Sequence, residues 1–283
     1  MHNYKNMVLE YDSDEATKEQ MDALEALDYI HVQVPCPLCF RKVVYPIYRD
    51  TAGALGHCMH CGMYYSHIRY SDEALKIYYS RFAPGFLVNK AILEVDKIRR
   101  PIQNNLDLDI IEQYKLGGKM LDIGSCAGDF LCRARDRGWD VIAQELSKDC
   151  QAVLAHLEIP VMTGFVYESE YTAKSLDVIT LRHTLEHFPA VLFSLTMLRE
   201  VLKDDGILYI VVPMWLGDEW CREGGHNLPQ HISHFTGRTL TEMLTVAGFE
   251  VLQLDYVDSS SAITIEELRN KPMNIRVVAR RRV

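Results

Sequence analysis

Residues 120–128 read Met-Leu-Asp-Ile-Gly-Ser-Cys-Ala-Gly, and this stretch decides the fold. A short apolar run ends at Asp122, and the chain passes through Gly124 and Gly128 before a helical pattern begins. This order predicts a strand, a tight turn and a helix, with backbone amides at the helix start available to a polar ligand. Glycine at both positions lets the backbone turn sharply and approach a flat or charged ligand group closely.

An acidic residue further along the chain is expected beside this turn, where it could contact the same ligand. The apolar run 141–144 ends at Glu145, at the tip of a second expected strand. A carboxylate in that place is positioned to accept hydrogen bonds from ribose hydroxyls. The turn and the carboxylate together indicate a nucleotide-like ligand more strongly than the glycine pattern alone.

The pattern departs from the dinucleotide fingerprint G-x-G-x-x-G, because position 126 is Cys and no third glycine follows at the expected offset. It resembles motif I of the class I S-adenosylmethionine (SAM)-dependent methyltransferases. In that family position 126 is usually Gly, and sugar C-methyltransferases tolerate Asn there. The residues alone also allow a structural strand–helix turn in another α/β protein. The resemblance implies a SAM site made by Asp122, Gly124, Ser125, Cys126, Gly128, Phe130, Glu145, Leu146, Arg182 and His183.

Strand and helix patterns alternate through the rest of the chain, which predicts an α/β fold with a mainly parallel, doubly wound sheet. The run 182–187, Arg-His-Thr-Leu-Glu-His, resembles the Leu-Glu-His signature that follows the fourth strand of the methyltransferases. The resemblance covers residues 119–283 and implies a Rossmann-like, seven-stranded sheet whose seventh strand lies antiparallel beside the fifth. Strands are expected at 175–181, 207–213, 249–257 and 275–280, and helices at 190–202 and 239–247.

Four cysteines upstream form two C-x2-C pairs, Cys36 with Cys39 and Cys58 with Cys61. Four thiolates at this spacing bind Zn²⁺ tetrahedrally, so we expect a zinc ribbon. We expect the ion to be structural and to supply the folding energy of so small a module. Packed or free cysteines remain an alternative, and disulfides are disfavoured because the sequence shows no signal peptide.

The sequence divides into an N-terminal extension with an acidic helix (1–34), a zinc ribbon (35–70), a helical lid (71–118) and a SAM-binding methyltransferase domain (119–283). We expect the ribbon and the SAM domain to have separate cores. No run approaches eighteen consecutive apolar residues, so no membrane span is expected. A hydrophobic share of 48% and a charged share of 24% favour a soluble, cytoplasmic protein.

The net charge of the chain helps to decide between nucleic-acid and small-molecule substrates. The chain carries 30 basic and 39 acidic residues, a net charge of −9, and its dense basic clusters are 97–100 and 280–282. Proteins that bind polyanionic backbones usually have a basic face, so a nucleic-acid partner is disfavoured. An RNA base methyltransferase remains an alternative, since ribosomal-RNA guanine methyltransferases also join a zinc module to this fold. A non-catalytic zinc-ribbon scaffold is the other alternative, which the intact motif I turn disfavours.

The loop after the fifth expected strand carries the candidate catalytic residues. The run 230–236, Gln-His-Ile-Ser-His-Phe-Thr, resembles the H-E-H-x-x-Y-F-S stretch of the sugar C-methyltransferases, with His231 at the position of the catalytic histidine. A neutral imidazole accepts protons near neutral pH, so we expect His231 to be a general base and His234 a second catalytic residue. Two alternatives stay open: structural histidines that hold the loop, or a metal site formed by His226, His231 and His234.

The segments 57–65 and 71–79 resemble the stretch that joins ribbon to catalytic domain in the same sugar enzymes and their shorter relatives. This likeness implies methyl transfer to a small molecule, such as a sugar, nucleotide-sugar or related metabolite. Tyr78, Tyr79 and Phe82 are expected near the cofactor, or else packed against the first helix of the sheet. Glu186 is expected to pair with an arginine or cap the next helix.

Overall fold

The computed structural model describes residues 31–81, 102–222, 228–258 and 272–282. The expectations for the N-terminal helix, for Phe82, for the basic run 97–100 and for His226 lie outside these residues. Within the described part of the chain, no helix has the length and apolar character needed to cross a membrane.

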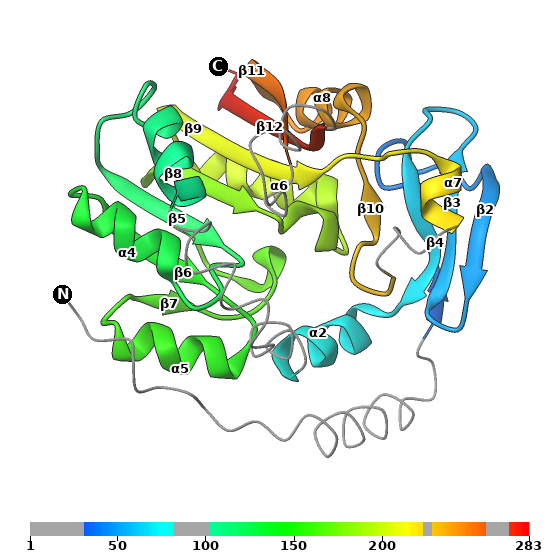
Figure 1. Cartoon of the computed structure of the whole chain (residues 1–283), viewed down its shortest axis with the longest axis horizontal. Helices are drawn as coiled ribbons and strands as arrows, with labels where there is room; N and C mark the ends of the chain where they lie inside the picture. The colour runs from blue at the N-terminus through cyan, green and yellow to red at the C-terminus, as the bar shows by residue number, and fades with distance from the viewer. Residues whose placement is uncertain (1–30, 82–101, 223–227, 259–271, 283) are drawn as a thin grey trace.

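A seven-stranded sheet forms the centre of the domain expected to bind SAM (residues 119–283, called the SAM domain below), in the order β11-β12-β9-β8-β5-β6-β7 (Figure 1). Strands β5 to β9 are parallel, and β12 lies antiparallel between β9 and β11. The expected antiparallel seventh strand is therefore confirmed. The strands are β5 (Lys119–Ile123), β6 (Asp140–Gln144), β7 (Val161–Met162), β8 (Leu176–Arg182), β9 (Leu202–Pro213), β11 (Phe249–Asp258) and β12 (Pro272–Arg281).

Helices cover both faces of this sheet. Successive strand residues point to opposite faces, so Met120 packs into one apolar cluster while Leu121 and Ile123 pack into the other. The helices on the Met120 face are that of residues 102–111, α4 (Asp129–Asp136) and α5 (Lys148–His156). On the opposite face lie α6 (Val191–Val201) and α8 (Gly237–Val246). The result is the three-layered, doubly wound fold that the sequence predicted.

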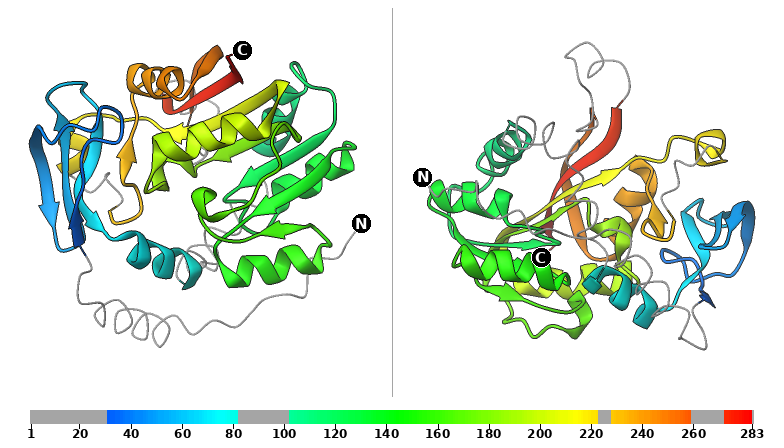
Figure 2. Two further views of the ribbon diagram at one scale, coloured as in Figure 1. Left: turned by 180° about the vertical axis from the view of Figure 1, so that it is seen from behind. Right: turned by 60° about the horizontal axis from the view of Figure 1, so that its bottom comes forward.

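The ribbon forms a second, antiparallel sheet beside the first (Figure 2). Its strands are β1 (His31–Gln33), β2 (Val44–Asp50), β3 (Gly53–Cys58) and β4 (Tyr64–Tyr70), and α2 (Asp72–Arg81) follows them. The fifth strand of this sheet is β10 (Ser233–His234), which comes from the SAM domain and pairs antiparallel with β4. Three short helices complete the description: η3 (Val166–Glu168), η4 (Leu185–His187) and α7 (Asp218–Trp220).

The expectation of separate cores is wrong. Cys58, Met63 and Tyr65 of the ribbon are buried in the same apolar cluster as Phe235 and Leu240 of the SAM domain. A module of this size cannot bury its own apolar side chains, so the neighbouring domain covers them. The ribbon is therefore packed onto the SAM domain and is not an independent unit.

Candidate active site

The motif I turn joins β5 to α4 through backbone conformations that few residues adopt. Gly124 and Gly128 have φ of 73° and 80°. A Cβ on Gly124 would lie 2.5 Å from Oγ1 of Thr184, so a side chain is excluded there by contact as well as by conformation. Cys126 also lies in the left-handed region, with φ of 55°. Glycine and asparagine adopt this conformation more readily than cysteine does, which fits the expected preference for glycine and the tolerance of asparagine at this position.

Glu145 braces this turn. Its carboxylate accepts hydrogen bonds from the backbone N–H of Cys126 and of Ser147, each 2.8 Å long. The side chain thus links the motif I turn to the start of α5, where the Ser147 hydroxyl accepts a hydrogen bond from the Cys150 amide. Burial raises the pKa of Glu145 above its ordinary value, while the three backbone amides around it oppose that shift. Its expected hydrogen bonds to a ribose remain a prediction.

Asp122 lies beneath the turn rather than at its surface. It is 3% exposed and accepts a 2.6 Å hydrogen bond from the Thr180 hydroxyl on the neighbouring strand β8. Burial raises the pKa of Asp122 to about 6, although the positive charge of Arg182 opposes that shift. Asp122 therefore supports the loop from below.

The side chain of Arg182 is engaged within the protein. Its guanidinium forms a 2.9 Å ion pair with Asp107 of the helix over residues 102–111, and it lies 4.1 Å above the ring of Phe130. Leu146 packs in an apolar cluster that includes Ile232 of the candidate catalytic loop. The cofactor-binding roles expected for these three residues remain predictions.

The loop that carries His231 is fastened on two sides. The backbone N–H of Ile232 donates to the Glu186 carbonyl, and the Ile232 carbonyl accepts from the N–H of Ser66 in β4; both bonds are 3.0 Å long. The ring of His231 lies 4.9 Å from that of His187 and 6.2 Å from that of His234. Burial lowers the pKa of His231 well below its usual range, and the neighbouring His187 adds to the shift. His231 is therefore a neutral imidazole at neutral pH.

Two tyrosines of α2 contact this loop. The Tyr79 hydroxyl donates a 2.8 Å hydrogen bond to the Gln230 carbonyl and lies 3.0 Å from Nδ1 of His187. Nε2 of Gln230 donates to the Tyr78 hydroxyl over 2.6 Å. Gln230 thus ties α2 to the candidate catalytic loop through both tyrosines, whose expected place near the cofactor remains a prediction.

Glu186 and His187 lie close to His231, and the sequence did not predict this proximity. Glu186 is 1% exposed, and within the described residues neither carboxylate oxygen has a hydrogen-bond partner. The expectation that it pairs with an arginine or caps a helix is wrong, because neither oxygen has such a partner and the described side chains within 4 Å that could carry a positive charge are the rings of His183 and His187. Burial raises the pKa of Glu186 to about 8. The available signal was a carboxylate between histidines in the run 183–187.

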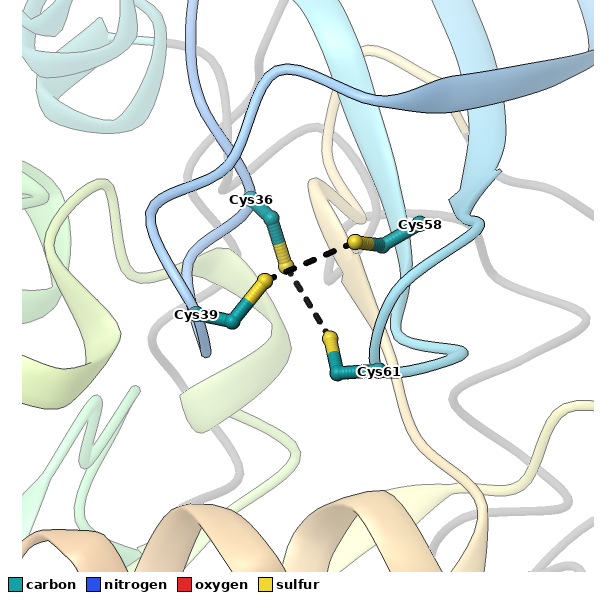
Figure 3. A group of neighbouring side chains, drawn as sticks. All are labelled: Cys36, Cys39, Cys58 and Cys61. Atoms are coloured by element: carbon teal, nitrogen blue, oxygen red, sulfur yellow. Dashed lines mark hydrogen bonds between the residues drawn. The ribbon is translucent and has the colours of Figure 1, made fainter.

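The four ribbon cysteines converge as the spacing predicted (Figure 3). Sγ of Cys36 lies 3.4 Å from that of Cys61, and Sγ of Cys39 lies 3.5 Å from that of Cys58. All four sulfur atoms lie within 4.8 Å of one another, and none is in a disulfide. A compact set of four thiols fits the tetrahedral coordination of Zn²⁺.

Comparison with known proteins agrees with this geometry. A family described as a methyltransferase domain matches residues 95–254. No curated protein matches the sequence. The 1,6-didemethyltoxoflavin-N1-methyltransferase of Burkholderia thailandensis, solved with bound 1,6-didemethyltoxoflavin and S-adenosylhomocysteine, is similar with a TM-score of 0.58 at 16% identity, over 84% of this chain and 99% of that chain. A SAM-dependent methyltransferase from Archaeoglobus fulgidus gives a TM-score of 0.53 at 19% identity, over 68% and 99% of the two chains. The chain therefore belongs to the methyltransferase family and has the fold of its SAM-dependent members.

Proposed function

We propose that this enzyme transfers a methyl group from SAM to a small-molecule acceptor, a sugar, nucleotide-sugar or related metabolite. The observation that carries the proposal is the position of the segment after β8. Thr184 of that segment borders the motif I turn at Gly124, and Glu186 holds the backbone of the His231 loop. A cofactor on the turn and an acceptor at the histidines would therefore be neighbours, as direct methyl transfer requires.

In this proposal the motif I turn binds SAM, with Glu145 accepting hydrogen bonds from the ribose. The acceptor attacks the methyl carbon, the bond from that carbon to sulfur breaks, and S-adenosylhomocysteine leaves. The neutral imidazole of His231 takes the acceptor's proton when the acceptor is a hydroxyl or an acidic C–H group. His234, which lies on β10, contacts the acceptor and orients it. The acceptor atom stays open between carbon, oxygen and nitrogen.

We propose further that Zn²⁺ binds Cys36, Cys39, Cys58 and Cys61. Four thiolates close the coordination sphere, so the ion serves structure and not catalysis. Its contribution to the site is indirect: the ribbon strand β4 pairs with β10 and so fixes the position of His234.

The small-molecule acceptor is supported by the likeness to sugar C-methyltransferases and by the net charge of −9, which disfavours RNA. The similar structure from Burkholderia thailandensis was solved with a small molecule bound. Two other functions would replace this proposal if the test below supported them: methylation of RNA, and a non-catalytic scaffold role.

The test is to incubate the full-length protein with SAM and, separately, with nucleotide-sugar pools, metabolite pools and RNA, and to screen by mass spectrometry for methylated products. Once the acceptor is known, His231→Ala should lower kcat by on the order of 10²-fold or more with nearly unchanged SAM affinity. His156→Ala, an exposed histidine at the end of α5, is the matched control. If RNA alone is methylated, the acceptor is RNA and the proposed small-molecule acceptor is wrong. Absence of SAM binding in calorimetry would refute the enzyme proposal.

A further inference from the structure

We propose that Glu186, His187 and His231 form a binding site for a divalent transition-metal ion at the acceptor side of the active site. The inference rests on the proposed function for what the ion does, but the binding of the ion is measured without turnover. The site is distinct from the four cysteines in its residues and in the chemistry of its donors.

The three side chains are brought together by two segments distant in sequence. Glu186 and His187 lie on η4, His231 lies on the loop before β10, and one ligand atom from each lies within 4.8 Å of the other two. The 3.0 Å backbone hydrogen bond from Ile232 to Glu186 holds the two segments in this arrangement. Two imidazoles and one carboxylate suit Mn²⁺, Fe²⁺, Co²⁺ and Zn²⁺.

Among the described residues, the carboxylate of Glu186 lacks the hydrogen-bond partners that a buried acid normally has. Its Oε1 lies 3.8 Å from Nδ1 of His183 and 3.9 Å from Nε2 of His187, which is too long for a hydrogen bond. Two atoms that each lie about 2.1 Å from one ion are at most about 4.2 Å apart, so the 3.9 Å between Glu186 Oε1 and His187 Nε2 fits shared ligation. An ion at this point would compensate the cost of burying the carboxylate.

The hydrogen bonding of His187 also supports a metal ion at this position. Its Nδ1 lies 2.8 Å from the Gln230 carbonyl, and a carbonyl only accepts, so Nδ1 carries the proton. In the neutral ring, Nε2 is then unprotonated and available as a ligand, 3.9 Å from Glu186 Oε1. A ring N–H donated to a backbone carbonyl is also the usual support of a metal-bound histidine.

Such an ion would leave coordination positions open to an acceptor oxygen. A metal ion lowers the pKa of a bound hydroxyl, whose proton can then pass to solvent. In the metal-loaded protein His231 is therefore a ligand, and in the metal-free protein it is the proton acceptor. The inference thus favours an acceptor with a hydroxyl group.

The test uses Mn²⁺, because this hard ion is a poor match for the thiolates of the ribbon. The full-length protein is titrated with Mn²⁺, and the electron paramagnetic resonance signal of the free ion is followed. We expect one Mn²⁺ per wild-type chain and affinity weaker by at least about tenfold in Glu186→Gln and in His231→Ala. Glu200→Gln and His156→Ala, both exposed and outside the site, should bind Mn²⁺ as the wild type does.

SAM binding by calorimetry serves as the folding control for each variant. The metal site is overturned if the wild type binds no Mn²⁺, or if folded Glu186→Gln and His231→Ala bind it with wild-type affinity. Methyl transfer by a protein that binds no Mn²⁺ would defeat this inference alone. Mn²⁺ binding by a protein that does not bind SAM would defeat the proposed function alone.

Discussion

Replacing Cys58 with Ser should destabilise the SAM domain as well as the ribbon. Cys58 is fully buried, with its sulfur 3.5 Å from that of Cys39, and it shares an apolar cluster with Met63, Tyr65 and the SAM domain. Burial of Met63 or Tyr65 contributes about 1.5–3 kcal/mol each, so separation of the ribbon would remove about 3–6 kcal/mol. In a chain of this size each kcal/mol changes Tm by about 2–4 °C, so Tm should fall by about 6 °C or more.

Thermal unfolding followed by circular dichroism, with zinc content measured on the same samples, checks this expectation. The matched control is Cys132→Ser, which makes the same thiol-to-hydroxyl change on α4 outside the shared cluster and should cost less. The kcat of Cys58→Ser should fall as well, because β4 holds β10 and its His234. A Cys58→Ser protein that has lost zinc but keeps the wild-type Tm and kcat would refute the reasoning.

Three further predictions concern the cofactor turn. Glu145→Ala removes the proposed charge-assisted hydrogen bond to the SAM ribose, worth about 1.5–3 kcal/mol, together with the acceptor of two backbone N–H groups of the turn. Calorimetry should therefore show SAM affinity lower by about tenfold or more; unchanged affinity would count against the ribose contact. Gly124→Ala places a Cβ 2.5 Å from Thr184 Oγ1 on a backbone in the left-handed region. Denaturant unfolding should therefore show a free energy of unfolding lower by at least about 1 kcal/mol. A variant as stable as the wild type would contradict the turn geometry. Burial raises the pKa of Asp122 to about 6, so the folded chain binds the Asp122 proton more tightly than the unfolded chain does. The free energy of unfolding should therefore fall as pH rises from about 4 to about 6. Asp122→Asn should lack that decline in urea unfolding, and a pH slope equal to that of the wild type would show that Asp122 does not cause it.

The parts of the fold that depend on local pattern could be predicted from the sequence. The alternation of strands and helices gave the doubly wound sheet, and Gly124 and Gly128 marked the turn because few other residues adopt its conformation. The fifth strand, expected at 207–213, begins earlier, since β9 starts at Leu202. The acidic pair at 204–205 interrupts the apolar pattern, yet it is extended and forms ion pairs with Lys174 and Lys115.

The parts that depend on contacts between distant segments could not be predicted. The pairing of β10 with β4 has no periodic signature, because β10 is only two residues long. The sequence predicted an arginine partner or a helix cap for Glu186, and only the return of the His231 loop over η4 shows this carboxylate in a buried site. Arg182 stands at a strand end that faces ligands in this fold, but Asp107 of another helix engages its charge.

The strand β10 also affects the order in which the chain is completed during synthesis. More than half of the sequence separates Tyr65 from its pairing partner Ser233, so the ribosome makes all four ribbon cysteines long before the strand that finishes their sheet. Until then the edge of β4 that faces away from β3 has, at Tyr64 and Tyr65, no partner among the described strands, and an open edge of this kind invites pairing with other chains. A nascent or truncated chain that ends before residue 233 would therefore tend to aggregate through its ribbon even with zinc bound.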